Sequence, residues 1–386
     1  MGFVSSLHRD RVPMVGGVDR VVSSADELRG LSVNDAFVVA LILSGGVSRL
    51  VREFAESYGL RRLLLVSHPG LNSLASALDA KALLSEVGID SGILHLNDLS
   101  RVNDALRVAR AIASILGIRV ALLGVRAKDN VARTFEDRFE ARVDAIPMES
   151  LEEMINGADE RVATEFVNYI RGKARFEAGD ERLMDVGRIY AAMRSLYGKY
   201  DATAINCFPY LIKHGVTPCL ALARLNEEGL IAACEADLRA LFSMVIAREL
   251  TGYSGWIANM NHVEGSRVTM SHCTIALNMV REARVVTHFE SGFSYGLTGK
   301  LLFNEVTGVS VSSDFRRMGI FSARVVESGL LSDRMCRTQA ILDLGVDSSL
   351  ILRLAPYNHH VILPGNVTRE LETIAGVLGM EVIKYA

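Results

Sequence analysis

The first 150 residues alternate between short, continuously apolar runs and longer segments with helical spacing. The apolar runs cover residues 36–43, 63–66, 93–96 and 120–124, and the helical segments cover about 47–58, 71–87 and 102–116. Continuous apolar runs are typical of strands buried on both faces, and strands that alternate with helices form parallel βαβ units. We therefore predict a helix-covered parallel sheet and assign residues 1–150 to an N-terminal α/β domain.

The turns after these predicted strands are the first place to look for ligand contacts. Ligands of parallel sheets gather at the carboxyl ends of the strands, which predicts one rim formed by Ser44-Gly45-Gly46, Ser67-His68-Pro69-Gly70 and Gly124-Val125-Arg126. The first turn lacks the spacing of a dinucleotide or P-loop motif, so a tight βα turn is favoured over a phosphate site. His68 is more typical of a loop residue than of a catalyst, and is a predicted substrate contact if the rim faces a sugar.

The middle of the chain predicts a second α/β domain over residues 151–254. Helical spacing covers 160–173 and 181–197, a strand-like run covers 202–207, and another helix begins at about 218. The apolar run 230–232 then leads through Glu235 and Asp237 into a segment that we expect to be an amphipathic helix ending at Gly252. Asp237 suits helix capping, and a carboxylate at such a junction is favoured by the helix dipole.

The last third predicts a smaller β-rich domain over residues 255–386. Short β-like runs at 267–270, 284–289, 306–311 and 349–354 are separated by Gly, Asp and Ser, which is typical of a small antiparallel sheet or barrel. We expect a closing helix over about 368–378 to pack on it. The predicted fold class is α/β, with two Rossmann-like parallel-sheet domains followed by this β-rich domain.

Composition and charge narrow the classes of partner. The chain is 49% hydrophobic and 23% charged, as in ordinary globular proteins. A formal net charge of -3 argues against nucleic acid or an anionic membrane as a partner. No apolar stretch approaches the roughly 18–20 residues of a membrane span, and the N-terminus lacks the basic and apolar regions of a signal peptide. We expect a cytoplasmic protein.

The cysteines do not form a recognisable framework. Their odd number and wide spacing match neither a disulfide scaffold nor a paired zinc site, and we expect small buried residues. Cys234 and Cys273 adjoin Glu235 and His272, so we expect them to line the inner wall of a site, without a catalytic role.

Several metal-ligating residues follow Glu235 along the chain. Asn259, His272 and the pair His359-His360 each lie beside a β-like run. One acid with well-separated histidines can supply a divalent metal site, although a single histidine beside a strand is more typical of a core or surface residue.

These segments resemble the L-fucose isomerase/L-arabinose isomerase superfamily, and its shorter members in particular. The matching motifs are Asn206-Cys207, Pro218-Cys219, Ala233-Cys234-Glu235-Ala236-Asp237, Ser271-His272-Cys273-Thr274, and Asn358-His359-His360-Val361 with Gly365. They cover the second half of the chain, and the first half matches by architecture. The resemblance implies two α/β domains, a β-rich C-terminal domain and a divalent ion, usually Mn2+. It also implies a homo-oligomer, often a trimer or hexamer, with a sugar bound between subunits.

The resemblance assigns roles residue by residue. Glu235 matches the first acidic metal ligand, His359 the late histidine ligand, and His272 an additional ligand of the arabinose branch. The position of the second acidic ligand holds Asn259. An asparagine can give a carbonyl oxygen to a cation, but it cannot carry a proton.

Three explanations for this departure remain open. Another acid, such as Glu264, Glu290 or Asp237, replaces the missing carboxylate. Alternatively, the reaction differs, for instance by using one base. In the third case the protein binds a sugar without converting it.

We predict a metal-dependent isomerase that interconverts an aldose and a ketose by enediol proton transfer. The metal would polarise the sugar oxygens, and Glu235 would act as ligand and general acid or base. His272 and His359 would be ligands, and Asn259 a weak ligand or substrate contact.

The surrounding residues carry less specific predictions. Glu290 and His360 are predicted substrate contacts, and His360, like His288, also suits a structural role beside the ligands. The alternative function, motivated by Asn259, is a non-catalytic sugar-binding or regulatory protein. A nucleotide-dependent enzyme is disfavoured because the chain lacks a phosphate-binding motif.

Overall fold

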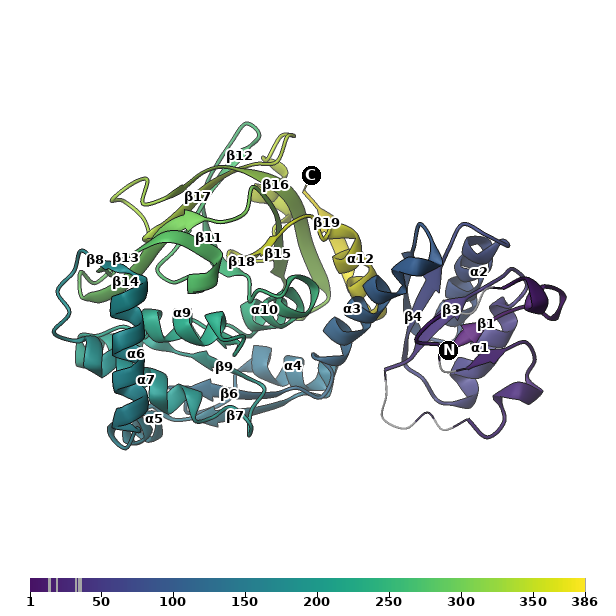
Figure 1. The fold of residues 1–386 in the computed structure, drawn as a ribbon, viewed down its shortest axis with the longest axis horizontal. Helices are drawn as coiled ribbons and strands as arrows, with labels where there is room; N and C mark the ends of the chain where they lie inside the picture. Colours follow the sequence, from purple (N-terminus) through teal and green to yellow (C-terminus); the bar gives the residue numbers. More distant parts are fainter. Residues whose placement is uncertain (13–14, 19, 32, 34–36, 386) are drawn as a thin grey trace. The chain divides into compact units, whose positions relative to one another are not determined.

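The computed structural model describes residues 1–12, 15–18, 20–31, 33 and 37–385 (Figure 1). The chain forms two compact units, one of residues 1–113 with 368–382 and one of residues 114–367 with 383–386. The predicted domain boundaries at residues 150 and 254 both fall inside the second unit. Among the described residues, no helix is long and apolar enough to cross a membrane.

The first unit is built on a five-stranded parallel sheet in the order β2-β1-β3-β4-β5. Its strands are β1 (Gly2–Phe3), β2 (Val21–Val22), β3 (Val39–Ile42), β4 (Arg62–Ser67) and β5 (Asp90–His95). Its helices are α1 (Ser48–Ser57), α2 (Ser73–Glu86), α3 (Val102–Ala113) and α12 (Thr368–Val377). The predicted strands and helices of this region are confirmed, apart from Ala36, which lies outside the described residues.

The closing helix α12 belongs to this first unit, so the prediction that it packs on the C-terminal sheet is wrong. It packs against β5 and α3. A Cβ added at Gly92 in β5 would lie 2.2 Å from the carbonyl oxygen of Thr373, so glycine permits this close approach. The apolar face of a helix shows that it must be buried, but not which sheet it covers.

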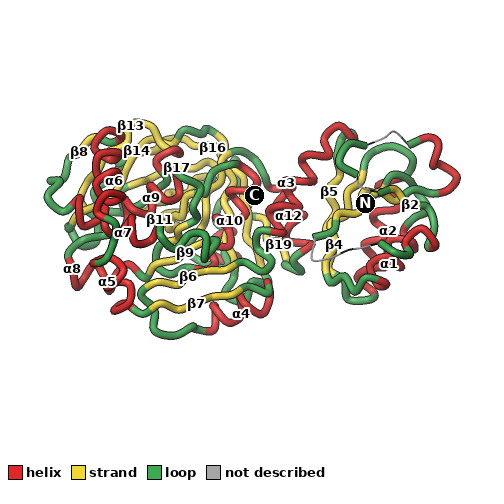
Figure 2. Tube along the Cα trace, turned by 60° about the horizontal axis from the view of Figure 1, so that its bottom comes forward, coloured by secondary structure: helices red, strands yellow, loops and turns green. Residues whose placement is uncertain are grey.

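The second unit begins with a four-stranded parallel sheet in the order β10-β9-β6-β7 (Figure 2). Its strands are β6 (Arg119–Leu123), β7 (Arg142–Ile146), β9 (Ala202–Ile205) and β10 (Ala232–Ala233). Its helices are α4 (Asn130–Phe139), α5 (Met148–Asn156), α6 (Glu160–Lys173), α7 (Leu183–Arg194), α8 (Cys207–His214), α9 (Cys219–Glu227) and α10 (Leu238–Thr251). Because β6 pairs in this sheet and not with β4 or β5, the prediction that Gly124 shares one rim with Ser44 and His68 is wrong.

An antiparallel barrel of six strands follows, closed by the pairing of β15 with β16. Its strands are β11 (Trp256–Glu264), β12 (Arg267–His272), β15 (Glu305–Val311), β16 (Arg317–Gly329), β17 (Thr338–Asp343) and β18 (His360–Pro364). A smaller sheet is formed by β8 (Arg175–Phe176), β13 (Val280–Thr287) and β14 (Ser294–Leu301), and β19 (Glu381–Lys384) lies beside β16. The predicted fold class is confirmed.

One predicted strand of this region is wrong. The run 349–354 contains the short helix α11 (Leu350–Leu354), with Ser349 as its N-cap. A short apolar run has no periodicity that separates a strand from a buried helical turn.

Helix α10 lies between the parallel sheet and the barrel, and contacts β9 and β10 on one side and β15 and β18 on the other (Figure 1). Residues 240–247 are all buried, which covers more than two full turns at 3.6 residues per turn. The prediction of an amphipathic helix is therefore wrong, since a helix covered on several sides is apolar all round. Its predicted ends are confirmed, with Asp237 as N-cap and Gly252 in the left-handed conformation.

Candidate metal centre

Three neighbouring barrel strands bring distant residues together. The sheet order places β11 between β18 and β12, with Ala258 opposite His360 and Asn259 opposite Ser271. His359 immediately precedes β18, and His272 ends β12. His359, Asn259 and His272 therefore lie on adjacent rungs at one end of the barrel.

Glu235 reaches these histidines from the turn between β10 and α10. Its Oε1 lies 3.5 Å from His272 Nε2 and its Oε2 lies 3.7 Å from His359 Nε2. One ligand atom from each of the three residues lies within 4.8 Å of the other two. Two atoms bound to one ion at about 2.1 Å each are at most about 4.2 Å apart. The two carboxylate–imidazole distances therefore fit a shared ion.

The turn that carries Glu235 has an uncommon backbone. Glu235 and Ala236 have φ of 57° and 51°, in the left-handed region that non-glycine residues rarely adopt. Backbone hydrogen bonds hold the turn, since the Ala236 N–H donates to the Ile205 carbonyl (2.8 Å) and the Asp237 N–H to the Cys234 carbonyl (3.1 Å). Such conformations persist where the surrounding structure fixes them, often at functional sites.

Asp237 uses its two carboxylate oxygens for different contacts. One oxygen caps helix α10, as predicted, and the other contacts His359. Oδ1 accepts the backbone N–H groups of Arg239 (2.9 Å) and Ala240 (3.3 Å), which confirms the predicted cap. Oδ2 accepts from Nδ1 of His359 at 2.8 Å. An ionised carboxylate only accepts, so His359 carries a proton on Nδ1, and Nε2 is the ring nitrogen that faces Glu235. Metal-bound histidines commonly have such an outer partner.

The groups around Asp237 and Glu235 keep both carboxyl groups ionised. Burial raises the pKa of Asp237, but His359 and the nearby Arg239 lower it more, and the net pKa lies below the ordinary value. Burial also raises the pKa of Glu235, whereas the imidazoles of His272 and His359 lower it, again with a net decrease. The ionised carboxylate of Glu235 beside the imidazoles of His272 and His359 forms a suitable donor set for a divalent cation.

His272 provides an independent indication of a missing partner. Its side chain is 4% exposed, and both ring nitrogens are buried without a hydrogen-bond partner among the described residues. Leaving a buried polar atom unpaired costs about 1–3 kcal/mol. An ion bound between Glu235 and His272 would satisfy Nε2, so the residues present fit the metal that the sequence predicts.

Sequence reasoning missed the groups that support Asp237. The Arg239 side chain donates from Nε to Asp237 Oδ1 at 3.2 Å, and its guanidinium carbon lies 3.3 Å from the ring centroid of Tyr357. Tyr357 in turn packs edge-on against His359, with ring centroids 5.6 Å apart. Tyr357 is two residues from His359, but its packing on Arg239 depends on tertiary structure and leaves no sequence signal.

The three acids that could replace the missing carboxylate at Asn259 lie in different surroundings. Glu264 ends β11, five residues or about 16 Å along the strand from Asn259, and its side chain is 84% exposed beside His262. Asp237 is engaged by the helix cap and by His359. Glu290 lines the same cavity as Glu235, Asn259 and His272.

Asn259 itself is held by a neighbour. The Asn358 side-chain Nδ2 donates to its Oδ1 at 2.6 Å, and the Asn358 Oδ1 accepts the N–H of Met260 at 3.1 Å. The amide oxygen of Asn259 is thereby oriented, and the residue lines the cavity.

The space between the atoms that line the cavity amounts to about 410 Å³, a volume that includes open solvent. Besides the acids and Asn259, its wall contains His288 and an apolar segment formed by Phe208, Leu211 and Pro218. Cys234 and Cys273 line it, as predicted, and so do Cys207, Cys219 and Cys336. His288 Nδ1 pairs with the Ser291 hydroxyl at 3.0 Å.

Two predicted substrate contacts are not among the residues that line this cavity. His360 is fully buried against Phe321 and Tyr385 and does not belong to the cavity wall. Burial lowers its pKa to about 4. His68 belongs to the first unit, where Gly70 N–H donates to its Nδ1 and its Nε2 donates to the Leu43 carbonyl. Its contact with a substrate stays a prediction.

Comparison with known proteins indicates a distant relation to sugar isomerases. The sulfoquinovose isomerase of Priestia aryabhattai is 26% identical over 199 residues, which are 48% of this chain and 44% of that protein. That of Alkalicoccus urumqiensis is 24% identical over 228 residues, 53% of this chain and 49% of that protein. The matched region thus spans slightly less than half of these relatives. No family model matches the chain.

Proposed function

We propose that this protein is a metal-dependent aldose–ketose isomerase that acts on a small sugar, with Mn2+ or another divalent cation held by Glu235, His272 and His359. The observation that carries the proposal is the convergence of these three ligand atoms within 4.8 Å. The distant similarity to sugar isomerases supports the reaction class. We further propose a homo-oligomer, trimeric or hexameric, whose neighbouring subunit completes the sugar site.

The chain's own residues would divide the work as follows. When bound, the divalent ion would act as a Lewis acid toward the sugar's carbonyl and hydroxyl oxygens. Glu235 is ionised and its side chain is 36% exposed, so it can accept a proton from the sugar carbon. Asp237 fixes the tautomer of His359. Isomerisation moves one proton between C1 and C2 and another between the two oxygens, so a second acid–base group is useful.

We assign that second role to Glu290. It is the remaining acid of the three considered at Asn259, because Glu264 lies away from the cavity and Asp237 is already engaged. In this assignment Asn259 orients the substrate through its amide and does not move a proton.

The proposal is tested by metal content and turnover on the same preparations. Elemental mass spectrometry after Mn2+ loading should find near-stoichiometric metal in the wild type and loss in Glu235→Gln and His359→Ala. His262→Ala, a matched variant of an exposed histidine (64% exposed), should keep its metal. Ketose formation should then be measured over a panel of aldoses that includes sulfoquinovose and uncharged sugars. Undiminished turnover in Glu235→Gln would exclude the proposed role.

Asn259 favours one alternative function. A protein that lacks the second carboxylate at this position can bind a sugar without converting it. In that case the wild type would bind a sugar of the panel and produce no ketose, and no exchange of sugar protons with D2O would be seen by NMR.

A further inference from the structure

The five cysteines of the chain come together at one cavity. They are free thiols from separate segments, namely Cys207 at the start of α8, Cys219 at the start of α9, Cys234 after β10, Cys273 after β12 and Cys336 before β17. All five line the cavity that contains Glu235 and His272. The proposed sugar reaction uses none of these sulfurs, so their common location calls for a separate explanation.

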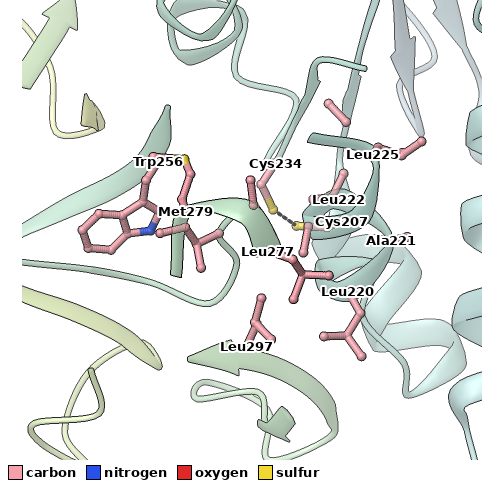
Figure 3. Packing of buried hydrophobic residues seen from close by; sticks show 14 of the residues in the cluster. Cys207, Leu220, Ala221, Leu222, Leu225, Cys234, Trp256, Leu277, Met279 and Leu297 are labelled. Carbon is pink, nitrogen blue, oxygen red and sulfur yellow. Dashed lines mark hydrogen bonds between the residues drawn. The ribbon is translucent and has the colours of Figure 1, made fainter. Parts of the chain in front are cut away.

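Cys207 and Cys234 form a close pair, with their Sγ atoms 3.3 Å apart (Figure 3). Both follow neighbouring parallel strands, because β9 pairs with β10 through Ala204 and Ala233. Their Cβ atoms are thereby held at the carboxyl ends of adjacent strands. A disulfide has an S–S length of about 2.05 Å, so the two sulfurs need to approach by only about 1.3 Å.

We propose that Cys207 and Cys234 are an oxidation site, at which a small peroxide converts the pair into a disulfide that disables the adjacent metal centre. In the first step one sulfur attacks a peroxide oxygen, the O–O bond breaks, and water leaves as a sulfenic acid forms. The second sulfur then attacks the sulfenic sulfur, the S–O bond breaks and a second water leaves. Two thiols and one hydrogen peroxide thus yield one disulfide and two waters.

The burial of the pair selects the oxidant. Cys207 is 8% exposed and Cys234 is 3% exposed, and both face a cavity that is partly open to solvent. A molecule as small as hydrogen peroxide can enter this space, whereas a bulky disulfide must bring its own sulfur into line with the attacking thiol. We therefore expect hydrogen peroxide to form the disulfide faster than oxidised glutathione does.

The disulfide would act on the metal centre through one peptide bond. Cys234 precedes Glu235, and its carbonyl accepts the N–H of Asp237, so moving the sulfur displaces the turn that carries both carboxylates. Metal sites tolerate only a few tenths of an ångström of ligand displacement. This second half of the inference rests on the proposed metal site, whereas formation of the disulfide does not.

The test treats the reduced full-length protein with hydrogen peroxide, alkylates the remaining thiols and maps the cross-linked peptides by mass spectrometry. We expect a Cys207–Cys234 cross-link that dithiothreitol reverses, and a loss of at least tenfold in Mn2+ affinity that is restored on reduction. Cys207→Ser should form no such cross-link and keep its Mn2+ affinity under peroxide. Cys219→Ser, a matched buried cysteine of the same wall, should behave as the wild type. Circular dichroism checks that both variants fold, and Cys207→Ala repeats the test with an apolar substitution.

The possible failures are distinguishable. A cross-link at other cysteines, or oxidation of Cys207 to sulfinic acid without a cross-link, would overturn the oxidation site. A Cys207–Cys234 disulfide that leaves Mn2+ affinity unchanged would overturn the coupling. Wild-type protein that binds no Mn2+ even when reduced would overturn the proposed function and the coupling, while the cross-link would still decide the oxidation site.

Discussion

Replacing Asp237 by asparagine isolates the buried Asp237–His359 contact from the rest of the metal centre. Asparagine matches aspartate in shape and is an equally good N-cap, so Oδ1 can keep the backbone N–H groups of Arg239 and Ala240. The amide NH2 then replaces Oδ2 opposite His359 Nδ1. An NH2 group only donates, so His359 must move its proton to Nε2, where it blocks the lone pair that faces Glu235.

The expected magnitude follows from this contact. The Nδ1–Oδ2 distance is 2.8 Å, with both side chains at most 3% exposed. Loss of an outer partner of a ligating histidine typically weakens metal binding 10–100-fold, or about 1.4–2.7 kcal/mol. We therefore expect Asp237→Asn to raise the Mn2+ dissociation constant by at least tenfold. The introduced amide can also flip, so that its oxygen accepts from His359 Nδ1 and metal binding is kept. Its NH2 would then face the N–H groups of the helix cap, at a cost of about 1–3 kcal/mol in folding stability.

The assay is calorimetric titration with Mn2+ together with urea unfolding of the metal-free protein. Asp159→Asn is a matched control, because Asp159 caps α6 through the N–H groups of Arg161 and Val162 and lies outside the metal centre. It should change neither Mn2+ affinity nor, by more than a few tenths of a kcal/mol, stability. If Asp237→Asn also leaves both quantities unchanged, the assigned roles of Asp237 are refuted.

Three further predictions concern the same centre. Asn259→Asp retains an acceptor for Asn358 and adds a carboxylate at the cavity. Because Glu290 is assigned the second acid–base role, this change should not increase ketose formation, and an increase would show that a base was missing and contradict the Glu290 assignment. Glu290→Gln should lower kcat by 10²–10⁴-fold, as loss of a general acid or base does, with Glu264→Gln as an unaffected control in steady-state assays. Stability should depend on pH through Asp237, whose folded pKa lies below its ordinary value. Its contribution is present above the unfolded pKa of about 3.9 and is lost as pH falls through the folded pKa. In urea unfolding, the stability difference between wild type and Asp237→Asn should therefore shrink below about pH 4, and a difference that grows there would contradict the assignment.

Local pattern determined much of the architecture. The strands β4 and β5 and the helices α1, α2 and α3 follow from apolar runs and helical spacing, since each run must be buried. The ends of α10 follow from Asp237 and Gly252, because capping depends on residues adjacent in sequence. Glu235, His272 and His359 were named as ligands from the resemblance of their motifs, and their roles remain proposals.

Only the tertiary structure decided which buried surfaces meet. An apolar run shows that a strand is covered, but not its neighbour, so the assignment of β6 to a second sheet and of α12 to the first unit could not be read from pattern. The contact of Asp237 with His359 spans 122 residues, and the pair Cys207–Cys234 depends on the register of β9 with β10. Local periodicity encodes how each segment is buried, whereas the distances between side chains of the candidate site are fixed by strand pairing between segments far apart in the chain.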